Sequence, residues 1–188
     1  MRALALALLM GICTFLQAQD LSKPMVLAAT PALKDPYYAG AVILVVPLGA
    51  DQHVGFIINK PTDITLGKVF PNDGASQKVQ QPVYIGGPLQ PQLIIALVQR
   101  TSSPDGKSLR VMPGLYASID GETVEGIIKA DPAHARFVAG MVTWQEGELA
   151  AELQAHAWYV LPPDERLLEM PANQLWETLS RRATAEVI

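Results

Sequence analysis

The stretch Gly140–Pro163 (GMVTWQEGELAAELQAHAWYVLPP) constrains the fold more than any other segment of the chain. Its apolar residues change period twice, which predicts a strand over Phe137–Trp144, a helix over Glu146–Ala155 and a strand over Ala157–Leu161. Two of the three tryptophans of the chain lie in this stretch. It therefore predicts mixed α and β structure.

The remaining apolar runs are short and rich in β-branched residues, which is typical of strands. The strands expected from these runs are Met25–Ala29, Gly40–Pro47, Val54–Asn59, Pro82–Ile85 and Leu93–Gln99, with Leu109–Met112 pairing back onto the last of them. Helical segments are expected at Asp35–Ala39, Thr65–Phe70, Glu122–Lys129 (capped by Asp120) and Pro171–Arg182, with a surface loop over Pro71–Gln81. These elements are enough for one domain with a single core.

The first residues predict export from the cytoplasm. Arg2 precedes the apolar run Ala3–Leu16, and Ala18 offers a small residue at which a signal peptidase would cut. We therefore expect a signal peptide over residues 1–18, a domain over residues 19–188, and a periplasmic or secreted protein without a stable membrane anchor. The alternative is an uncleaved N-terminal anchor. Cleavage would remove Cys13, the only cysteine, so thiol chemistry is not expected.

Charge argues against nucleic-acid binding. The chain carries 14 basic and 18 acidic residues, for a net charge of -4, whereas nucleic-acid binding depends on basic surface. No nucleic-acid partner is expected from these totals.

Polar residues give few signs of chemistry. Glu148, Glu152 and His156 are spaced four apart and would share a face if the helix ran that far, so they are weak candidates for a metal site. Three such residues span about 12 Å of a straight helix, too far to converge on one ion, and a solvated face is favoured. Gly86-Gly87-Pro88 lacks the spacing of a phosphate-binding loop and is expected to be a tight turn. No cofactor is expected.

Four blocks of this sequence resemble the YqgE/AlgH-type family of bacterial proteins of uncharacterised function. They are LAATPALKDP (27–36), GFIINKP (55–61), PVYIGGPLQP (82–91) and the segment 140–158, and the last helix with Trp176 also fits. The resemblance implies an α+β fold, in which a mixed, bifurcated β-sheet forms a pseudo-barrel with helices packed outside. Members are sometimes labelled transcriptional regulators, and no enzymatic activity comes with the family.

This chain departs from the family pattern at several polar positions. Where the family has Gly-Gln-Leu-Glu-x-Glu, this chain has Gly147-Glu148-Leu149-Ala150-Ala151-Glu152, so only the last glutamate is kept. His156 replaces a common asparagine, and the histidine usual near Pro47 is absent, although His53 lies close by. Typical members also lack a signal peptide, so the regulator label transfers poorly to an exported protein.

Three functions follow as hypotheses. The first is a non-enzymatic domain that binds an unknown protein or small molecule, with a pocket where Asn59, Gly86, Gly87, Trp144 and Glu152 converge. The second is a metal-dependent hydrolase that uses Glu148, Glu152 and His156. The third is a cytoplasmic regulator that acts through protein contacts.

Overall fold

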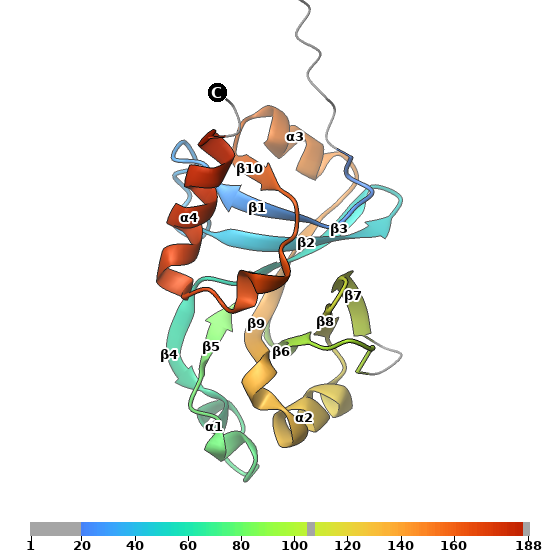
Figure 1. Cartoon of the computed structure of the whole chain (residues 1–188), viewed down its shortest axis with the longest axis vertical. Helices are drawn as coiled ribbons and strands as arrows, with labels where there is room; N and C mark the ends of the chain where they lie inside the picture. Colours follow the sequence, from blue (N-terminus) through green and yellow to red (C-terminus); the bar gives the residue numbers. More distant parts are fainter. Residues whose placement is uncertain (1–19, 105–107, 186–188) are drawn as a thin grey trace, which may run out of the picture.

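The fold is organised by one strand that divides a curved sheet. The computed structural model describes residues 20–104 and 108–185, so the predicted signal peptide lies outside the described residues (Figure 1). Within them, the strands form one curled, mainly antiparallel sheet, in the order β10-β1-β2-β3-β9-β6-β8-β7, with β4 and β5 branching from β9. The strands are β1 Met25–Ala29, β2 Val42–Gly49, β3 Gln52–Ile57, β4 Pro61–Thr65, β5 Pro82–Ile85, β6 Leu89–Gln99, β7 Ser108–Met112, β8 Leu115–Ser118, β9 Ala135–Trp144 and β10 Trp158–Leu161.

The branch point lies along β9, which is the longest strand of the Gly140–Pro163 region. One edge of β9 pairs antiparallel with β6. Its other edge pairs with β3 through Val142–Trp144, but with β5, in parallel, through Val138 and Ala139. The sheet is thus mixed and bifurcated, and its curled half-barrel shape confirms the predicted α+β class.

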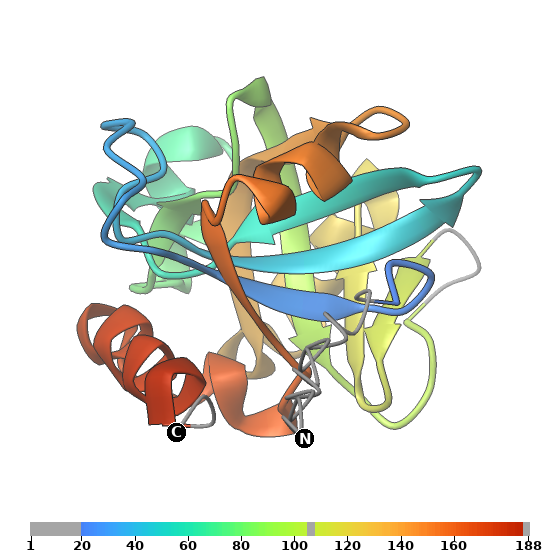
Figure 2. The same cartoon turned by 90° about the horizontal axis from the view of Figure 1, so that it is seen from above.

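Helices cover the outside of the sheet. They are α1 Leu66–Val69, α2 Gly121–Ala130, α3 Glu148–Gln154 and α4 Ala172–Ala185, with 3₁₀ turns η1 Ser76–Lys78, η2 Pro132–His134 and η3 Glu165–Leu168. Figure 2 shows α3 and α4 outside the strands β1 to β3. Because β2 is buried on both faces, Ile43 and Val45 pack with Leu149 of α3, while Leu44 packs with Leu175 of α4. Burial on both faces explains why the sequence of this strand is an uninterrupted apolar run.

The second half of the molecule has its own core beneath α2. Buried residues of β6, β9 and α2 meet there, among them Ala96, Phe137 and Ile127. Asp120 caps α2 as predicted, since its side chain accepts a hydrogen bond from the Thr123 amide. No helix among residues 20–104 and 108–185 is long and apolar enough to cross a membrane.

Several predicted elements were wrong in extent or pairing. Leu109–Met112 pairs with Leu115–Ser118 and not with β6, because that four-residue strand, which the sequence analysis missed, lies between them. Strand β4 was missed because a proline begins it. Residues 35–39 form turns and no helix, and the Asp35 carboxylate accepts hydrogen bonds from the Tyr37 and Tyr38 amides. The predicted loop 71–81 contains η1 and the buried Ser76.

Candidate functional site

Trp144 and Glu152, both predicted to line a ligand pocket, lie together at the end of β9. Glu152 is on α3, and its Oε2 accepts hydrogen bonds from the indole nitrogens of Trp144 (2.9 Å) and Trp158 (2.7 Å). The Trp144 side chain is only 3% exposed, and its ring leaves no room for a side chain at Gly55. The carboxylate therefore satisfies two buried indole donors, and Trp144 belongs mainly to the core.

A cavity of about 360 Å³ borders this centre. It is lined by Tyr38, Val142, Thr143, Trp144, Glu148, Ala151, Glu152 and Trp158. Asn59, Gly86 and Gly87 do not line it, so the structure does not bring the five predicted residues to one cavity.

Asn59 closes a turn at the start of β2. Its side-chain oxygen accepts a hydrogen bond from the Val42 amide, and its amide nitrogen donates to the Gly40 carbonyl, both at 2.8 Å. The side chain thus satisfies backbone groups that no strand partner reaches.

Gly86 and Gly87 lie where the sheet divides. The Gly86 amide donates to the Ala139 carbonyl (2.7 Å), and the Gly86 carbonyl accepts from the Ile57 amide (2.8 Å), so this residue links β9 to β3. A Cβ on Gly87 would lie 2.0 Å from the carbonyl carbon of Met141. Glycine is required here because two backbones approach closely, and these amides are not arranged around an anion.

The three weak metal candidates have separate roles. Glu148 Oε2 accepts a hydrogen bond from the Gln145 amide (2.8 Å), and Glu152 holds the two indoles. The predicted helix through residue 155 ends at Gln154, so His156, with φ of 54°, does not continue its face. Nowhere in residues 20–104 and 108–185 do three or more His, Cys, Asp or Glu side chains gather closely enough to hold a metal ion.

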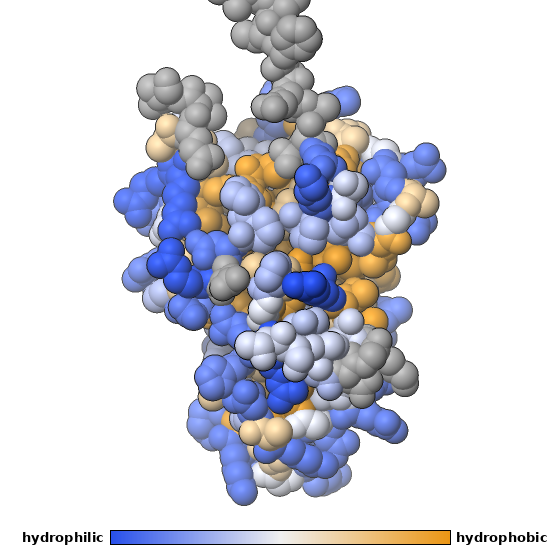
Figure 3. Space-filling model, turned by 45° about the vertical axis from the view of Figure 1, so that its right-hand side comes forward, coloured by the Kyte–Doolittle hydropathy of each residue, from blue (hydrophilic) through white to orange (hydrophobic). Residues whose placement is uncertain are grey.

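A larger groove, which the sequence analysis did not identify, lies between α2 and the segment 69–76. We call this cavity of about 620 Å³ the α2 groove. Its wall is mainly apolar, and it is lined by Val69, Phe70, Pro71, Asn72, Asp73, Ser76, Gln92, Leu93, Ile94, Gly121, Val124, Glu125 and Ile128. Most of the surface around this end of the molecule is hydrophilic, as Figure 3 shows for one face. Phe70, one of the few large apolar residues that are exposed in the described part of the chain, lies at this groove.

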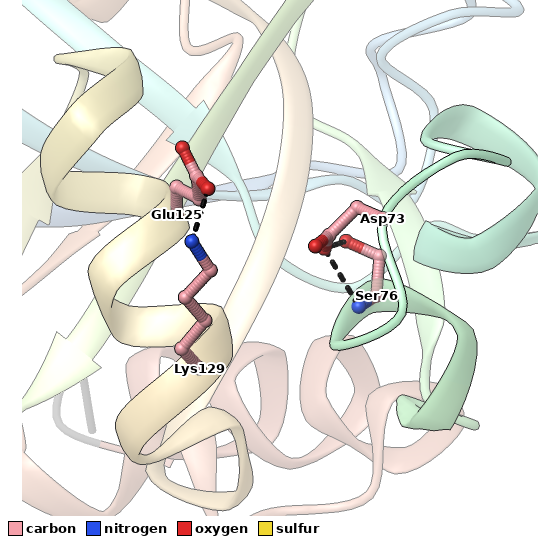
Figure 4. A network of polar contacts seen from close by, with 4 residues as sticks. All are labelled: Asp73, Ser76, Glu125 and Lys129. Carbon is pink, nitrogen blue, oxygen red and sulfur yellow. Dashed lines mark hydrogen bonds and ion pairs between the residues drawn. The ribbon is translucent and has the colours of Figure 1, made fainter.

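Each side of the α2 groove has a polar contact of its own (Figure 4). On one side, Asp73 accepts hydrogen bonds from the Ser76 hydroxyl (2.5 Å) and amide (2.8 Å). These bonds, led by the one from the hydroxyl, lower the pKa of Asp73, so its carboxylate stays charged. On the other side, Glu125 pairs with Lys129 on the exposed face of α2. The groove is thus an apolar hollow with two acidic groups at its rim, Asp73 on one side and Glu125, which is paired with Lys129, on the other.

The sequence contained partial signals for this groove. Asp73 and Ser76 have the spacing of a local capping interaction, and α2 is a helix whose Val124, Ile127 and Ile128 are buried. What the sequence did not show is that the segment 69–76 stands off from α2, which depends on the missed strand β4 and its pairing with β5.

Comparisons with known proteins agree on the family. A family model described as AlgH-like matches residues 26–187. A UPF0301 protein of Anaeromyxobacter dehalogenans is 29% identical over 171 residues, covering 85% of this chain and 86% of the relative. A UPF0301 protein of Myxococcus xanthus is 28% identical over 162 residues, covering 84% and 88%.

Two solved structures share the fold. The solution structure of the AlgH protein from Pseudomonas aeruginosa has a TM-score of 0.70 and 26% identity, and the match covers 87% of each chain. The crystal structure of a protein from Corynebacterium diphtheriae also has a TM-score of 0.70 and 26% identity, covering 86% of each chain. The predicted resemblance to the YqgE/AlgH-type family is thereby confirmed.

Proposed function

The chain belongs to the AlgH-like family, whose members are uncharacterised, and we propose that it is a non-enzymatic binding domain with its ligand site in the α2 groove. The observation that carries this proposal is a cavity of about 620 Å³ with a mainly apolar wall and a few polar groups. Ligand sites in proteins usually combine these features, and the volume lies within their usual range.

The lining defines the kind of ligand. Val124, Ile128, Ile94 and Phe70 offer apolar surface, which favours an apolar ring or side chain. Asp73 is a charged carboxylate at the rim, and the whole chain has a net charge of -4. A neutral or positively charged ligand is therefore favoured over an anion.

The proposal is tested with a neutral apolar fluorophore, N-phenyl-1-naphthylamine. Gly121 lines the groove, and a Cβ on it would meet no atom within 4 Å, so Gly121→Leu can narrow the groove without backbone strain. Gly126→Leu is the matched control, because Gly126 is on the same helix, has equal space and does not line the groove. We expect saturable binding by the wild type and the control, and binding weakened about ten-fold or more in Gly121→Leu. Equal binding by all three proteins would refute the assignment.

Export is a separate part of the proposal. The signal peptide expected over residues 1–18 would place the binding domain in the periplasm or outside the cell. A reporter that is active only after export, fused behind residues 1–25, is expected to be active, and Leu8→Arg in the apolar run should abolish that activity. An inactive fusion would favour the alternative, a cytoplasmic regulator that acts through protein contacts.

A further inference from the structure

We propose that Arg136 forms a binding site for a small oxyanion, a carboxylate or a phosphate, in a second cavity. This cavity has a volume of about 180 Å³ and lies between β5, the end of β6 and the turns η2 and η3. It is lined by Gln81, Pro82, Tyr84, Gln99, Ala133, His134, Ala135, Arg136 and Leu168, and shares no residue with the α2 groove. The inference is therefore independent of the proposed function.

The guanidinium group of Arg136 is buried and is paired with no acidic side chain in the part of the chain that the structure describes. The residue is only 9% exposed. Its Nη1 donates to the Ile58 carbonyl (2.7 Å), and its Nη2 donates to the carbonyls of Leu168 (2.8 Å) and Met170 (3.5 Å). A guanidinium has five N–H donors, so at least two remain without an acceptor among the described residues.

These contacts offset only part of the cost of burying a cation. The guanidinium carbon lies 4.8 Å from the centre of the Tyr84 ring, which adds a cation–π contact. Burial lowers the pKa of Arg136, while its interaction with Tyr84 raises it. Arginine nevertheless stays charged in proteins, so a net positive charge remains beside the cavity. An anion would gain more here than beside an exposed arginine, because less water competes.

The cavity suits a small polar ligand. Its volume corresponds to about six water molecules, which is room for one carboxylate or phosphate group with some water. No Asp or Glu is found in its lining among the residues that the structure describes. The Asp131 carboxylate lies 2.7 Å from His134 Nδ1 and is outside the lining, so it pairs with the histidine at the edge of the cavity and not with Arg136. The remaining donors of Arg136, among them Nε–H, can donate charge-assisted hydrogen bonds to the oxygens of such an anion.

The test follows the Arg136 Nε–H resonance by NMR while inorganic phosphate or acetate replaces chloride at constant ionic strength. We expect a saturable shift with at least one of the two oxyanions. Gln81→Glu would put a carboxylate into the lining, and should weaken binding about ten-fold or more. Gln80→Glu is the matched control, because it makes the same charge change on the neighbouring residue, which does not line the cavity.

The outcomes distinguish specific oxyanion binding at Arg136 from a general response to surface charge. Binding that Gly121→Leu leaves unchanged and that only Gln81→Glu weakens supports the proposal, whatever the fate of the α2 groove. Absence of a saturable shift with both oxyanions would overturn it and leave Arg136 as a structural link between three carbonyls. Equal weakening by Gln80→Glu and Gln81→Glu would also overturn it, because it would show a response to surface charge alone.

Discussion

The two ends of β9 carry opposite charges, and the protein stabilises them in parallel ways. Near the start of the strand, Arg136 donates hydrogen bonds to three backbone carbonyls. At its end, Trp144 donates to Glu152, which also accepts a bond from Trp158. In both places a charged side chain makes its hydrogen bonds with neutral groups. None of these partners carries the opposite charge. Hydrogen bonds to charged groups are stronger than neutral ones, so either arrangement ties several elements together.

The difference lies in which group needs a partner. Each indole has a single donor, and both indoles are satisfied by Glu152, so the carboxylate completes the core around α3. At the other end the charged group itself is buried, and its three carbonyl acceptors leave at least two of its five N–H donors without an acceptor in the described part of the chain. The first arrangement is therefore complete without a ligand, whereas the second leaves donors for the anion that we propose.

The largest loss of stability is expected from a change that displaces the middle of β9, because such a change would disturb both ends of the strand. Gly87→Ala would place a Cβ 2.0 Å from a backbone atom of Met141. Overpacked side chains usually cost about 1–3 kcal/mol, and because a paired strand cannot shift easily, we expect a loss of about 4 kcal/mol or more in the free energy of unfolding. Urea denaturation measures it. The control Gly126→Ala, on the exposed face of α2 with open space around it, should stabilise by about 1 kcal/mol. A mild effect of Gly87→Ala would show that the strand is not rigid enough to fix its two ends.

Arg136→Leu removes the positive charge and its hydrogen bonds at the start of β9, and it leaves Glu152 and its two tryptophans unchanged. Three carbonyls lose a donor and the cation–π contact is lost, so we expect a destabilisation of about 3 kcal/mol, measured by urea denaturation. Arg110→Leu removes an exposed arginine from β7, and should change stability by less than about 0.5 kcal/mol. If the two variants behaved alike, the carbonyl contacts of Arg136 would contribute little to stability.

Glu152 variants test the anionic end. Glu152→Leu leaves two buried indole donors without an acceptor, for an expected cost of about 2–3 kcal/mol. Glu152→Gln keeps a carbonyl oxygen that can accept both bonds, and should cost about 1 kcal/mol. Thermal or urea unfolding gives the stabilities, and the indole N–H resonances of Trp144 and Trp158 report the bonds directly. Equal costs for the two variants would mean that the charge, and not the acceptor, holds the tryptophans.

Sequence patterns predicted the part of this comparison that depends on local order. Trp144, Glu152 and Trp158 lie within one strand–helix–strand unit, so their proximity follows from the predicted elements. The partners of Arg136 come from residues 58, 168 and 170, which only the folded chain brings to β9. The α2 groove was missed for the same reason, since strand pairing between β4 and β5 positions one of its walls. The tight turn expected at Gly86-Gly87-Pro88 was wrong, because residues 86–88 form no turn. The two glycines are instead required by a close backbone approach where the sheet branches, and that branch has no local signal in the sequence.

The smallest effect concerns Tyr38, which lines the cavity beside Glu152. Burial raises the pKa of Tyr38 most, and the nearby Tyr37, Glu152 and Asp35 raise it further. Because the folded state holds the neutral phenol, the stability contributed by Tyr38 is complete below its unfolded pKa of about 10 and is lost as pH rises through the folded pKa. Tyr38→Phe should therefore lose less stability than the wild type above that pH. In Glu152→Gln, an NMR titration of the tyrosine ring should find the pKa of Tyr38 lower than in the wild type yet still raised, because burial is the larger cause. An unchanged pKa would show that the charge of Glu152, which is hydrogen-bonded to two indoles, has no effect on Tyr38.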